Sequence, residues 1–311
     1  MSTVAPELSR PLTTEGTLVS VAPSYRVRDF VELCKPKIAV MGLYTVAVGF
    51  FVGSRGQWSF PQLLHTLLGV GLVAISCSVL NQFVERNTDR RMRRTATRPL
   101  PTGRISANEA LAFGLGAGVI GLTWLALRVN LLTTALAAIT LLSYVGIYTP
   151  LKRWSGLSTV IGAIPGALPP VLGYAAAAGT LDAGAFSLFA LLFLWQFPHF
   201  LAIAWLLRDQ YASAGLKMIP RLSGRGVGLL AVGYGTALIP ASLLPSFSGL
   251  AGDFYLLTAI GLGLAYLWSS IQFARQGDDT AARRVLWASF LYLPTLLAVL
   301  TLDHWQLLSY R

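Results

Sequence analysis

Charged residues are scarce in this sequence. They make up 12% of its 311 residues, which is about half of their share in a typical soluble domain. Acidic residues are the scarcer kind, because 13 aspartates and glutamates stand against 24 lysines and arginines, a net charge of +11. Hydrophobic residues make up 54% of the chain, and its mean hydropathy is +0.62. This composition excludes an ordinary soluble domain and indicates an all-α integral membrane protein.

Cysteine is nearly absent as well. The only two, Cys34 and Cys77, have neither metal-ligand spacing nor the pattern of a disulfide framework, which excludes redox chemistry as the main function. Residues 1–25 lack the apolar core of a signal peptide and are polar, with several prolines, serines and threonines. We therefore expect residues 1–30 to be a flexible cytoplasmic tail before a single transmembrane domain at 31–305.

What the sequence does have is long apolar runs. Nine are long enough to cross the hydrocarbon core of a bilayer, which takes roughly 17–25 helical residues each. They lie near 38–54, 62–83, 109–127, 131–149, 158–178, 184–206, 227–246, 254–274 and 283–302. Prolines at 165, 169 and 170 should kink or locally unwind the fifth run. Neither a strand pattern nor a water-soluble domain is evident.

The breaks between these runs determine the predicted orientation. A cytoplasmic N-terminus places 21 of the 24 lysines and arginines inside and leaves Arg55, Arg128 and Arg311 outside. The positive-inside rule therefore predicts that the C-terminus is external. Because the basic residues are spread over short breaks between apolar runs, the net positive charge does not indicate a nucleic-acid partner.

The polar stretch after the second run, from Asn81 to Arg104, carries the strongest functional signal. It holds seven arginines and only two acids. Asn81, Glu85 and Asp89 recur every four residues, so on a helix they lie about 40° apart on one face, on turns about 6 Å apart. Mg²⁺ prefers such oxygen ligands and often shares them with diphosphate oxygens, while arginines bind phosphate through forked hydrogen bonds. The alternative is a helix leaving the bilayer, with arginines as an anchor and acids as their counter-ions.

Two further breaks on the same side contain candidate residues. Lys152 and Arg153 follow the fourth run, where the alternative is a snorkelling anchor. The inner end of the sixth run carries a second polar group, which consists of Gln196, His199, Arg208, Asp209 and Tyr211. His199 has apolar neighbours, and ionisable groups in membrane spans are functional candidates, although a buried histidine can also be a satisfied core residue. If the two polar helix ends face each other, they form a pocket for a diphosphate head and a hydrocarbon tail.

Several stretches, in order along the chain, resemble the UbiA superfamily of membrane prenyltransferases, whose first motif is N-x-x-x-D-x-x-x-D. Together they cover about residues 30–302. They are CKPKIAVMGLYT at 34–45, the first motif with the following RTATRPL at 81–100, YTPLKR at 148–153, IGAIPGALPP at 161–170, WQFPHF at 195–200 and ARRVLWASFLYLP at 282–294. The WQFPHF block favours the branch that farnesylates haem over the branch that prenylates quinone precursors.

The resemblance implies a reaction. The chain would transfer the farnesyl group of farnesyl diphosphate to the 2-vinyl group of haem b, with addition of water, and give haem O and diphosphate. Mg²⁺ would bind the catalytic residues Asn81, Glu85 and Asp89, with Asp209 as a weaker further ligand. The cations expected to hold the diphosphate are Arg94, Arg98, Lys152, Arg153 and Arg208.

The resemblance also implies the surroundings of the reaction. Haem would be a substrate rather than a cofactor, contacted by Tyr211 and by His199, the latter through the iron or through a propionate. The expected location is a bacterial inner membrane, with the active site on the cytoplasmic side. Expected partners are the lipid bilayer and a haem A synthase or terminal oxidase assembly.

The sequence departs from the superfamily pattern at two acidic positions. Glu85 stands where aspartate is usual, and Gln210 stands where an acid is frequent, which weakens a second metal site. Two alternatives remain open at this stage. One is a prenyltransferase of the same fold that acts on a quinone precursor or another aromatic acceptor. The other is a transporter, which would place binding groups near the membrane midplane and show an internal repeat, whereas the acids here cluster towards one face.

Overall fold

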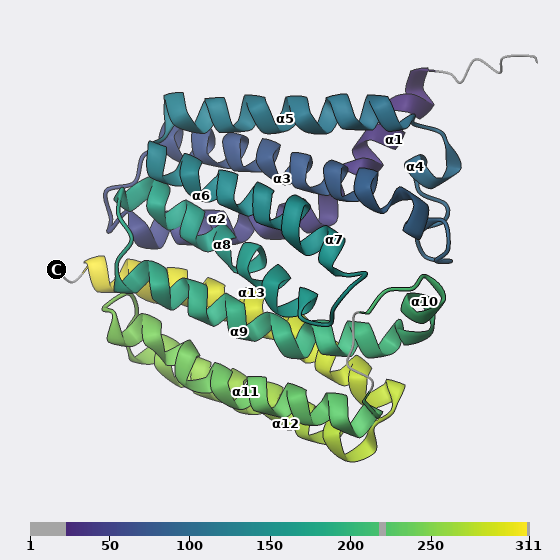
Figure 1. Cartoon of the computed structure of the whole chain (residues 1–311). Coiled ribbons are helices and arrows are strands. Elements are labelled where there is room, and N and C mark those ends of the chain that lie inside the picture. The colour runs from purple at the N-terminus through teal and green to yellow at the C-terminus, as the bar shows by residue number, and fades with distance from the viewer. Residues whose placement is uncertain (1–22, 218–221, 310–311) are drawn as a thin grey trace, which may run out of the picture.

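The computed structural model describes residues 23–217 and 222–309, and every element within these ranges is a helix (Figure 1). Among the described residues, nine helices are long and apolar enough to cross a membrane, as predicted. They are α2 (Pro36–Gly53), α3 (Phe60–Asp89), α5 (Ala107–Arg128), α6 (Leu131–Leu142) with its continuation to Leu151, α8 (Ser158–Ala178), α9 (Ala183–Leu206), α11 (Gly224–Phe247), α12 (Asp253–Gln276) and α13 (Asp279–Ser309).

Side chains at the helix ends set where several spans begin. The first amides of a helix lack an intrahelical acceptor, and short polar side chains supply one. Ser106 and Glu109 form a reciprocal capping box at the start of α5. Asn130 caps α6 and Asp182 caps α9. Asn130 and Asp182 thus start new helices where only a few residues separate one apolar run from the next.

The fifth span was expected to kink or locally unwind at its prolines, and the unwinding does not occur, because α8 stays helical through Pro165, Pro169 and Pro170. It packs tightly against α2, where a Cβ on Gly49 would overlap the Pro170 carbonyl, and this packing holds the segment helical. The irregular helix lies instead in the fourth span. There, α6 passes into the π-helical turn η1 (Ser143–Tyr148), a type of element that is frequent at functional sites.

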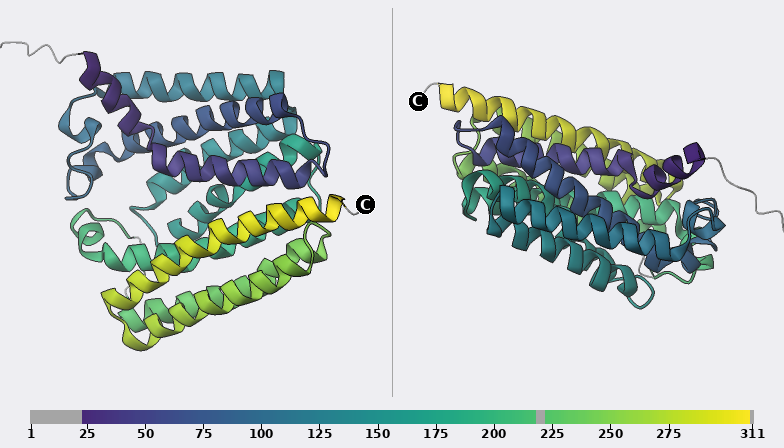
Figure 2. Two further views of the ribbon diagram at one scale, coloured as in Figure 1. Left: turned by 180° about the vertical axis from the view of Figure 1, so that it is seen from behind. Right: turned by 90° about the horizontal axis from the view of Figure 1, so that it is seen from above.

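The spans pack as two groups. Helices α2, α3, α5, α6 and α8 form one group, and α9, α11, α12 and α13 form the other (Figures 1 and 2). Small residues allow close approach within the first group, since a Cβ on Gly114, Gly118 or Gly121 of α5 would press on side chains of α3. The groups meet mainly where α8 packs on α9 and α2 packs on α13.

Short helices gather at one end of the bundle, which we call the polar end. It is formed by α1 (Pro23–Leu33), α4 (Pro99–Thr102), α10 (Arg208–Ser213) and the last turns of α3, with α7 (Thr149–Leu151) nearby (Figure 1). Helix α13 ends at the opposite end of the bundle. With nine spans, the N-terminal and C-terminal ends of the domain therefore lie at opposite ends, as the predicted topology requires.

The expected flexible tail ends earlier than residue 30. From Pro23 onwards the chain is helix α1, which is held to the bundle because buried Asp29 forms an ion pair with Arg104, with 2.9 Å between Oδ1 and Nη1. Phe30 also packs edge-on against Phe113 of α5. Residues 1–22 of the expected tail, and the terminal Arg311, lie outside the described residues.

Candidate active site

The predicted metal-binding residues lie on the last turns of α3, which continues past its apolar part to Asp89. Asn81 and Asp89 are almost fully buried, with 2% and 1% of their surface exposed. The Asn81 amide donates to Thr149 Oγ1 at 3.0 Å, which leaves its oxygen Oδ1 available as an acceptor. Thr95 donates to the Asp89 carbonyl at 2.9 Å and so closes the helix end. The predicted arrangement on one helix is confirmed.

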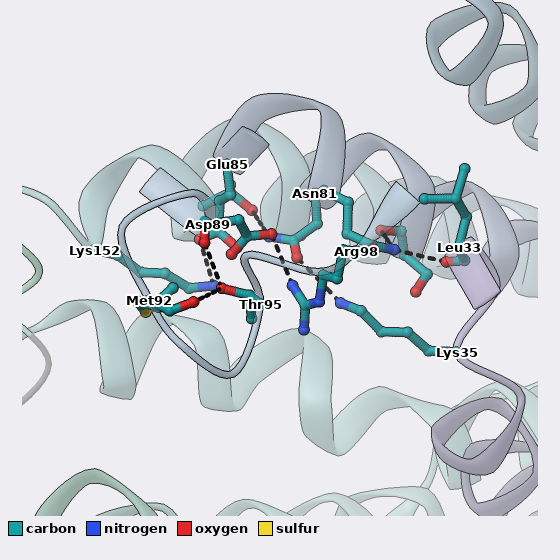
Figure 3. A network of polar contacts seen from close by, with 12 residues as sticks. Leu33, Lys35, Asn81, Glu85, Asp89, Met92, Thr95, Arg98 and Lys152 are labelled. Carbon is teal, nitrogen blue, oxygen red and sulfur yellow. Dashed lines mark hydrogen bonds and ion pairs between the residues drawn. The ribbon is translucent and has the colours of Figure 1, made fainter. Parts of the chain in front are cut away.

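Each carboxylate of this face holds one cation (Figure 3). Lys152 Nζ lies 2.9 Å from Glu85 Oε1, and Arg98 Nη1 lies 2.8 Å from Asp89 Oδ2. Arg98 comes from the loop that follows α3, whereas Lys152 follows α7, so two separate segments converge on the end of α3. Both cations were predicted to hold diphosphate, and both lie beside the predicted metal ligands.

Lys35 is a third cation at this site, and sequence reasoning assigned it no role. Its Nζ lies 3.5 Å from Asn81 Oδ1. Burial, followed by the nearby Arg98 guanidinium, lowers the pKa of Lys35 to about 8. The available signal was a lysine placed immediately before Pro36, the first residue of a span.

These residues line a cavity of about 430 Å³ at the polar end of the bundle. Its charged lining consists of four cations and two carboxylates, a net charge of +2: Lys35, Arg94, Arg98, Lys152, Glu85 and Asp89. Its other lining includes Tyr144, Tyr148, Phe200 and Ile203. The cations and the two carboxylates suit a metal-bound diphosphate. The aromatic and aliphatic walls suit an apolar group joined to it.

The second polar helix end reaches this cavity through only one of its five predicted residues. Tyr211 of α10 lines it, and burial raises the pKa of its phenol. Two backbone contacts join the opposing loops. Arg94 N–H donates to Gln210 Oε1 at 3.3 Å, and Lys217 N–H donates to the Lys152 carbonyl at 2.9 Å.

Three predicted residues are not brought to the cavity. Arg208 pairs with Asp279 of α13 at 2.7 Å, and Asp209 is exposed beside it. Arg153 is exposed, donates to Thr88 of α3 at 3.0 Å and does not line the cavity. For Arg208 and Asp209 the cause is the break at Leu207, because the new helix α10 turns Tyr211, rather than its first residues, towards the cavity.

His199 is buried on α9 but does not line the cavity either. Its Nδ1 lies 2.7 Å from Ser289 Oγ, and that hydroxyl donates its one hydrogen to the Leu286 carbonyl at 2.6 Å. With that hydrogen on the Leu286 carbonyl, Oγ accepts from Nδ1–H, and this arrangement leaves a lone pair on Nε2. The ring stacks on Trp195 at 5.2 Å and meets the edge of Phe290 at 5.3 Å. Phe200, the next residue along, does line the cavity.

The chemistry of the donor set fits Mg²⁺. Two carboxylates and one amide oxygen share one helix face, and the part of the chain that the structure describes contains no cluster of three or more histidine, cysteine or acidic side chains. Such a set is too small for a closed, all-protein site. It matches the habit of Mg²⁺, which takes one or two protein carboxylates and completes its shell with substrate phosphates and water.

The model of the UbiA prenyltransferase family matches residues 42–293, which is most of the sequence. The chain belongs to the UbiA prenyltransferase family. Among similar UbiA relatives, a protoheme IX farnesyltransferase of Solibacter usitatus is 46% identical, over 89% of this chain and 99% of that protein. A protoheme IX farnesyltransferase of Koribacter versatilis is 41% identical, over 89% of this chain and 93% of that protein.

Solved structures have the same fold as this UbiA chain. A digeranylgeranylglyceryl phosphate synthase superposes with a TM-score of 0.75 at 18% identity, covering 91% of this chain and 99% of that one. A UbiA homologue of Archaeoglobus fulgidus, bound to DMAPP and Mg²⁺, superposes with a TM-score of 0.64 at 21% identity, covering 91% and 100%. At these identities the likeness establishes the fold alone.

Proposed function

We propose that this chain transfers the farnesyl group of farnesyl diphosphate to the 2-vinyl group of haem b. Farnesyl diphosphate, haem b and water give haem O and diphosphate. The observation that carries the proposal is the convergence of Asn81, Glu85 and Asp89 with buried cations on one cavity that also has apolar walls. The names of relatives more than 40% identical over most of their length support haem b as the acceptor.

The cations of the cavity act on the leaving group. Lys35, Lys152 and Arg98 surround the place where a diphosphate would meet the face of α3, and Arg94 lines the cavity from the same loop as Arg98. As the bond between farnesyl C1 and oxygen breaks, negative charge grows on the diphosphate. Positive groups fixed in a site of low dielectric stabilise that charge most.

The predicted metal ligands keep their roles in the proposal. Asn81, Glu85 and Asp89 would hold Mg²⁺, with Arg98 and Lys152 moving from the carboxylates to phosphate oxygens. When bound, Mg²⁺ supplies Lewis-acid stabilisation of the departing diphosphate. Asp209 is exposed outside the cavity, so we do not retain it as a ligand.

The walls of the cavity protect the other product of bond cleavage, an allylic cation. Tyr144 and Tyr148, whose ring centroids lie 5.2 Å apart, and Phe200 of α9 line the same cavity as the phosphate-binding cations. Aromatic faces attract cations, and apolar walls exclude water that would quench the cation early. The vinyl π electrons of haem then form the new bond to C1, water adds to the resulting cation, and a proton leaves.

Haem b is proposed to bind against α9 beside the cavity. His199 offers Nε2 as an iron ligand, because Ser289 holds the proton on Nδ1, and the described residues place no charged group in contact with the ring that would favour an imidazolium. This favours iron over a propionate as the group that His199 contacts. Phe200 and Tyr211, which line the cavity, would meet the porphyrin edge.

The proposed setting is a bacterial inner membrane with the polar end of the bundle in the cytoplasm, as the distribution of lysine and arginine predicts. Haem O would then pass to a haem A synthase or a terminal oxidase. A reporter fused at Gly277 should indicate the cytoplasm, and one fused after Arg311 the external side. The opposite pattern would overturn the orientation.

The deciding experiment compares haems extracted from cells that lack and regain this chain. We expect haem O, identified by pyridine haemochrome spectra and mass spectrometry, only when the chain is present. If haem O is unaffected while a prenylated quinone or another aromatic product disappears, the acceptor is wrong and the second prenyltransferase alternative holds.

A further inference from the structure

Gln82 follows Asn81 directly on α3, but its side chain contacts a different part of the molecule. It is 1% exposed and does not line the active-site cavity. Its amide donates to the Leu33 carbonyl at 2.7 Å and to the Ser78 carbonyl, one turn earlier in α3, at 3.1 Å. Because both partners are carbonyl oxygens, only the NH2 end of the amide can face them, which fixes the orientation of the side chain. Gln82 is therefore a donor directed at another segment, and the proposed chemistry gives it no role.

The segment that Gln82 holds is the end of α1, where Leu33 is the last residue. The last carbonyls of a helix have no donor within the helix, and Gln82 supplies one. The Leu33 side chain is also fully buried, in a cluster with Val79 and Ile105. Both the main chain and the side chain of Leu33 are thus held by α3 and the segment that follows α3. This fixes the start of the α1–α2 joint, by which we mean residues 34–35.

The joint contains an unusual backbone conformation. Lys35 has φ 49° and ψ 60°, in the left-handed region, which residues with a Cβ adopt rarely. Pro36 follows, and a proline further restricts the residue before it towards extended conformations. Glycine would fit this turn at no steric cost, yet the position carries a lysine whose ammonium lies 3.5 Å from Asn81 Oδ1 (Figure 3). Such strain persists where surrounding contacts determine the conformation, and it is frequent at functional sites.

We propose that Gln82 is a positioning residue for the diphosphate site, because its bond to the Leu33 carbonyl maintains the left-handed turn that directs Lys35 to the metal-ligand face of α3. The inference rests on the proposed function for the role of Lys35 as a phosphate-binding cation, and it adds the residue that places this cation. A single turn of α3 then sets both parts of the head site. Asn81 lines the cavity, and Gln82, about 100° further around the helix, holds the α1–α2 joint.

The other contacts of α1 precede this joint. The ion pair between Asp29 and Arg104 and the aromatic contact of Phe30 hold the body of the helix to the bundle. They do not involve Gln82 and would remain if its amide were replaced. Loss of the amide should therefore release the turn at Lys35 without detaching α1.

Gln82→Met tests this, because it removes the donor and nearly keeps the volume of the side chain. We expect the Kd of radiolabelled farnesyl thiodiphosphate with Mg²⁺ to rise by roughly three- to tenfold, as for the loss of one hydrogen bond. The KM for farnesyl diphosphate should rise with it, while the KM for haem b stays native. Gln82→Leu lacks the same donor in a different shape and should give the same shift.

The matched control is Gln62→Met. Gln62 is another glutamine of α3 that donates to a backbone carbonyl of a different helix, that of Ala176, at 2.8 Å. It lies near the start of α3, whereas Gln82 lies near its end. Gln62→Met should therefore keep the native Kd for farnesyl thiodiphosphate.

A double-mutant cycle separates positioning from general stabilisation. If Gln82 acts through Lys35, Gln82→Met should add nothing to the Kd of Lys35→Met protein, because residues that act through one contact are not additive. Equal increases in both backgrounds would overturn the inference. An unchanged Kd in both Gln82 variants, or failure of both to fold, would leave Gln82 as a helix cap and overturn it as well. If the native protein binds no farnesyl thiodiphosphate with Mg²⁺, the proposed function itself fails.

Discussion

Lys152 Nζ lies 2.9 Å from Glu85 Oε1, and only 11% and 13% of the two side chains is exposed. The ammonium also lies over the Tyr148 ring, 4.2 Å from its centroid. Burial alone would lower the pKa of Lys152, but Tyr148 and Glu85 together raise it above its ordinary value. Lys152 therefore remains a cation throughout the physiological range and can exchange a carboxylate oxygen for a phosphate oxygen.

We expect Lys152→Met to raise the KM for farnesyl diphosphate by roughly 10- to 100-fold, the equivalent of one charge-assisted hydrogen bond of about 1.5–3 kcal/mol. Steady-state kinetics with haem b in excess measures it. The matched control is Arg153→Met, the adjacent cation, which is exposed and lies outside the cavity. Equal effects of the two substitutions would show that the cavity does not mark the diphosphate site.

Glu85 and Lys152 also show which parts of the site the sequence could predict and which it could not. The shared face of Asn81, Glu85 and Asp89 was predictable, because helical periodicity is local and α3 is a regular helix to its end. The choice between Lys152 and Arg153 was not, since it depends on the rotation that η1 and α7 give to the chain. The place of Lys35 likewise depends on how α2 packs on α3, which no local pattern encodes.

Glu85 tests the metal site through the length of its side chain. Glu85→Asp should retain substantial activity, because aspartate is usual at this position of the superfamily motif and keeps the charge. Glu85→Ala and Asp89→Ala should each abolish turnover while membrane insertion, followed by detergent-extracted yield, stays normal. An active Asp89→Ala enzyme would mean that the metal ligands are misassigned.

Lys35 was identified only in the structure, so it provides an independent test. We expect Lys35→Met to raise the KM for farnesyl diphosphate by about tenfold, because the ammonium lines the active-site cavity beside Asn81. Lys37→Met is the control, since Lys37 is exposed two residues away and does not line this cavity. A larger effect of Lys37→Met would show that Lys35 does not belong to the diphosphate site.

Removal of Mg²⁺ should abolish binding of the prenyl diphosphate and leave binding of haem b intact. With EDTA, we expect binding of radiolabelled farnesyl thiodiphosphate to be lost, because the carboxylates would then face phosphate oxygens without a bridging cation. Haem b binding, followed by its absorbance spectrum, should persist, since His199 lies outside the cavity lined by the metal ligands. Loss of haem binding together with diphosphate binding would contradict this division.

Ser289 provides the last prediction, because in the proposed haem site it would act only through His199. In the proposed tautomer its hydroxyl accepts from Nδ1 and donates to the Leu286 carbonyl, and it holds the ring in its orientation. Removing such a supporting hydrogen bond weakens metal binding by about 10- to 100-fold in other histidine sites. We therefore expect Ser289→Ala to weaken haem b binding and to shift its Soret band, while Mg²⁺-dependent binding of farnesyl thiodiphosphate stays native.

Two comparisons make the Ser289 test specific. Ser289→Thr keeps the hydroxyl and should restore the native Soret band, whereas His199→Ala should lose that band and haem O formation altogether. Ser270→Ala removes another fully buried hydroxyl, which donates to the Tyr266 carbonyl on the same helix, and it should leave the haem spectrum unchanged. If Ser289→Ala and Ser270→Ala lower the yield of folded protein alike and neither changes the spectrum, Ser289 is only a packing residue and His199 does not ligate the iron through Nε2.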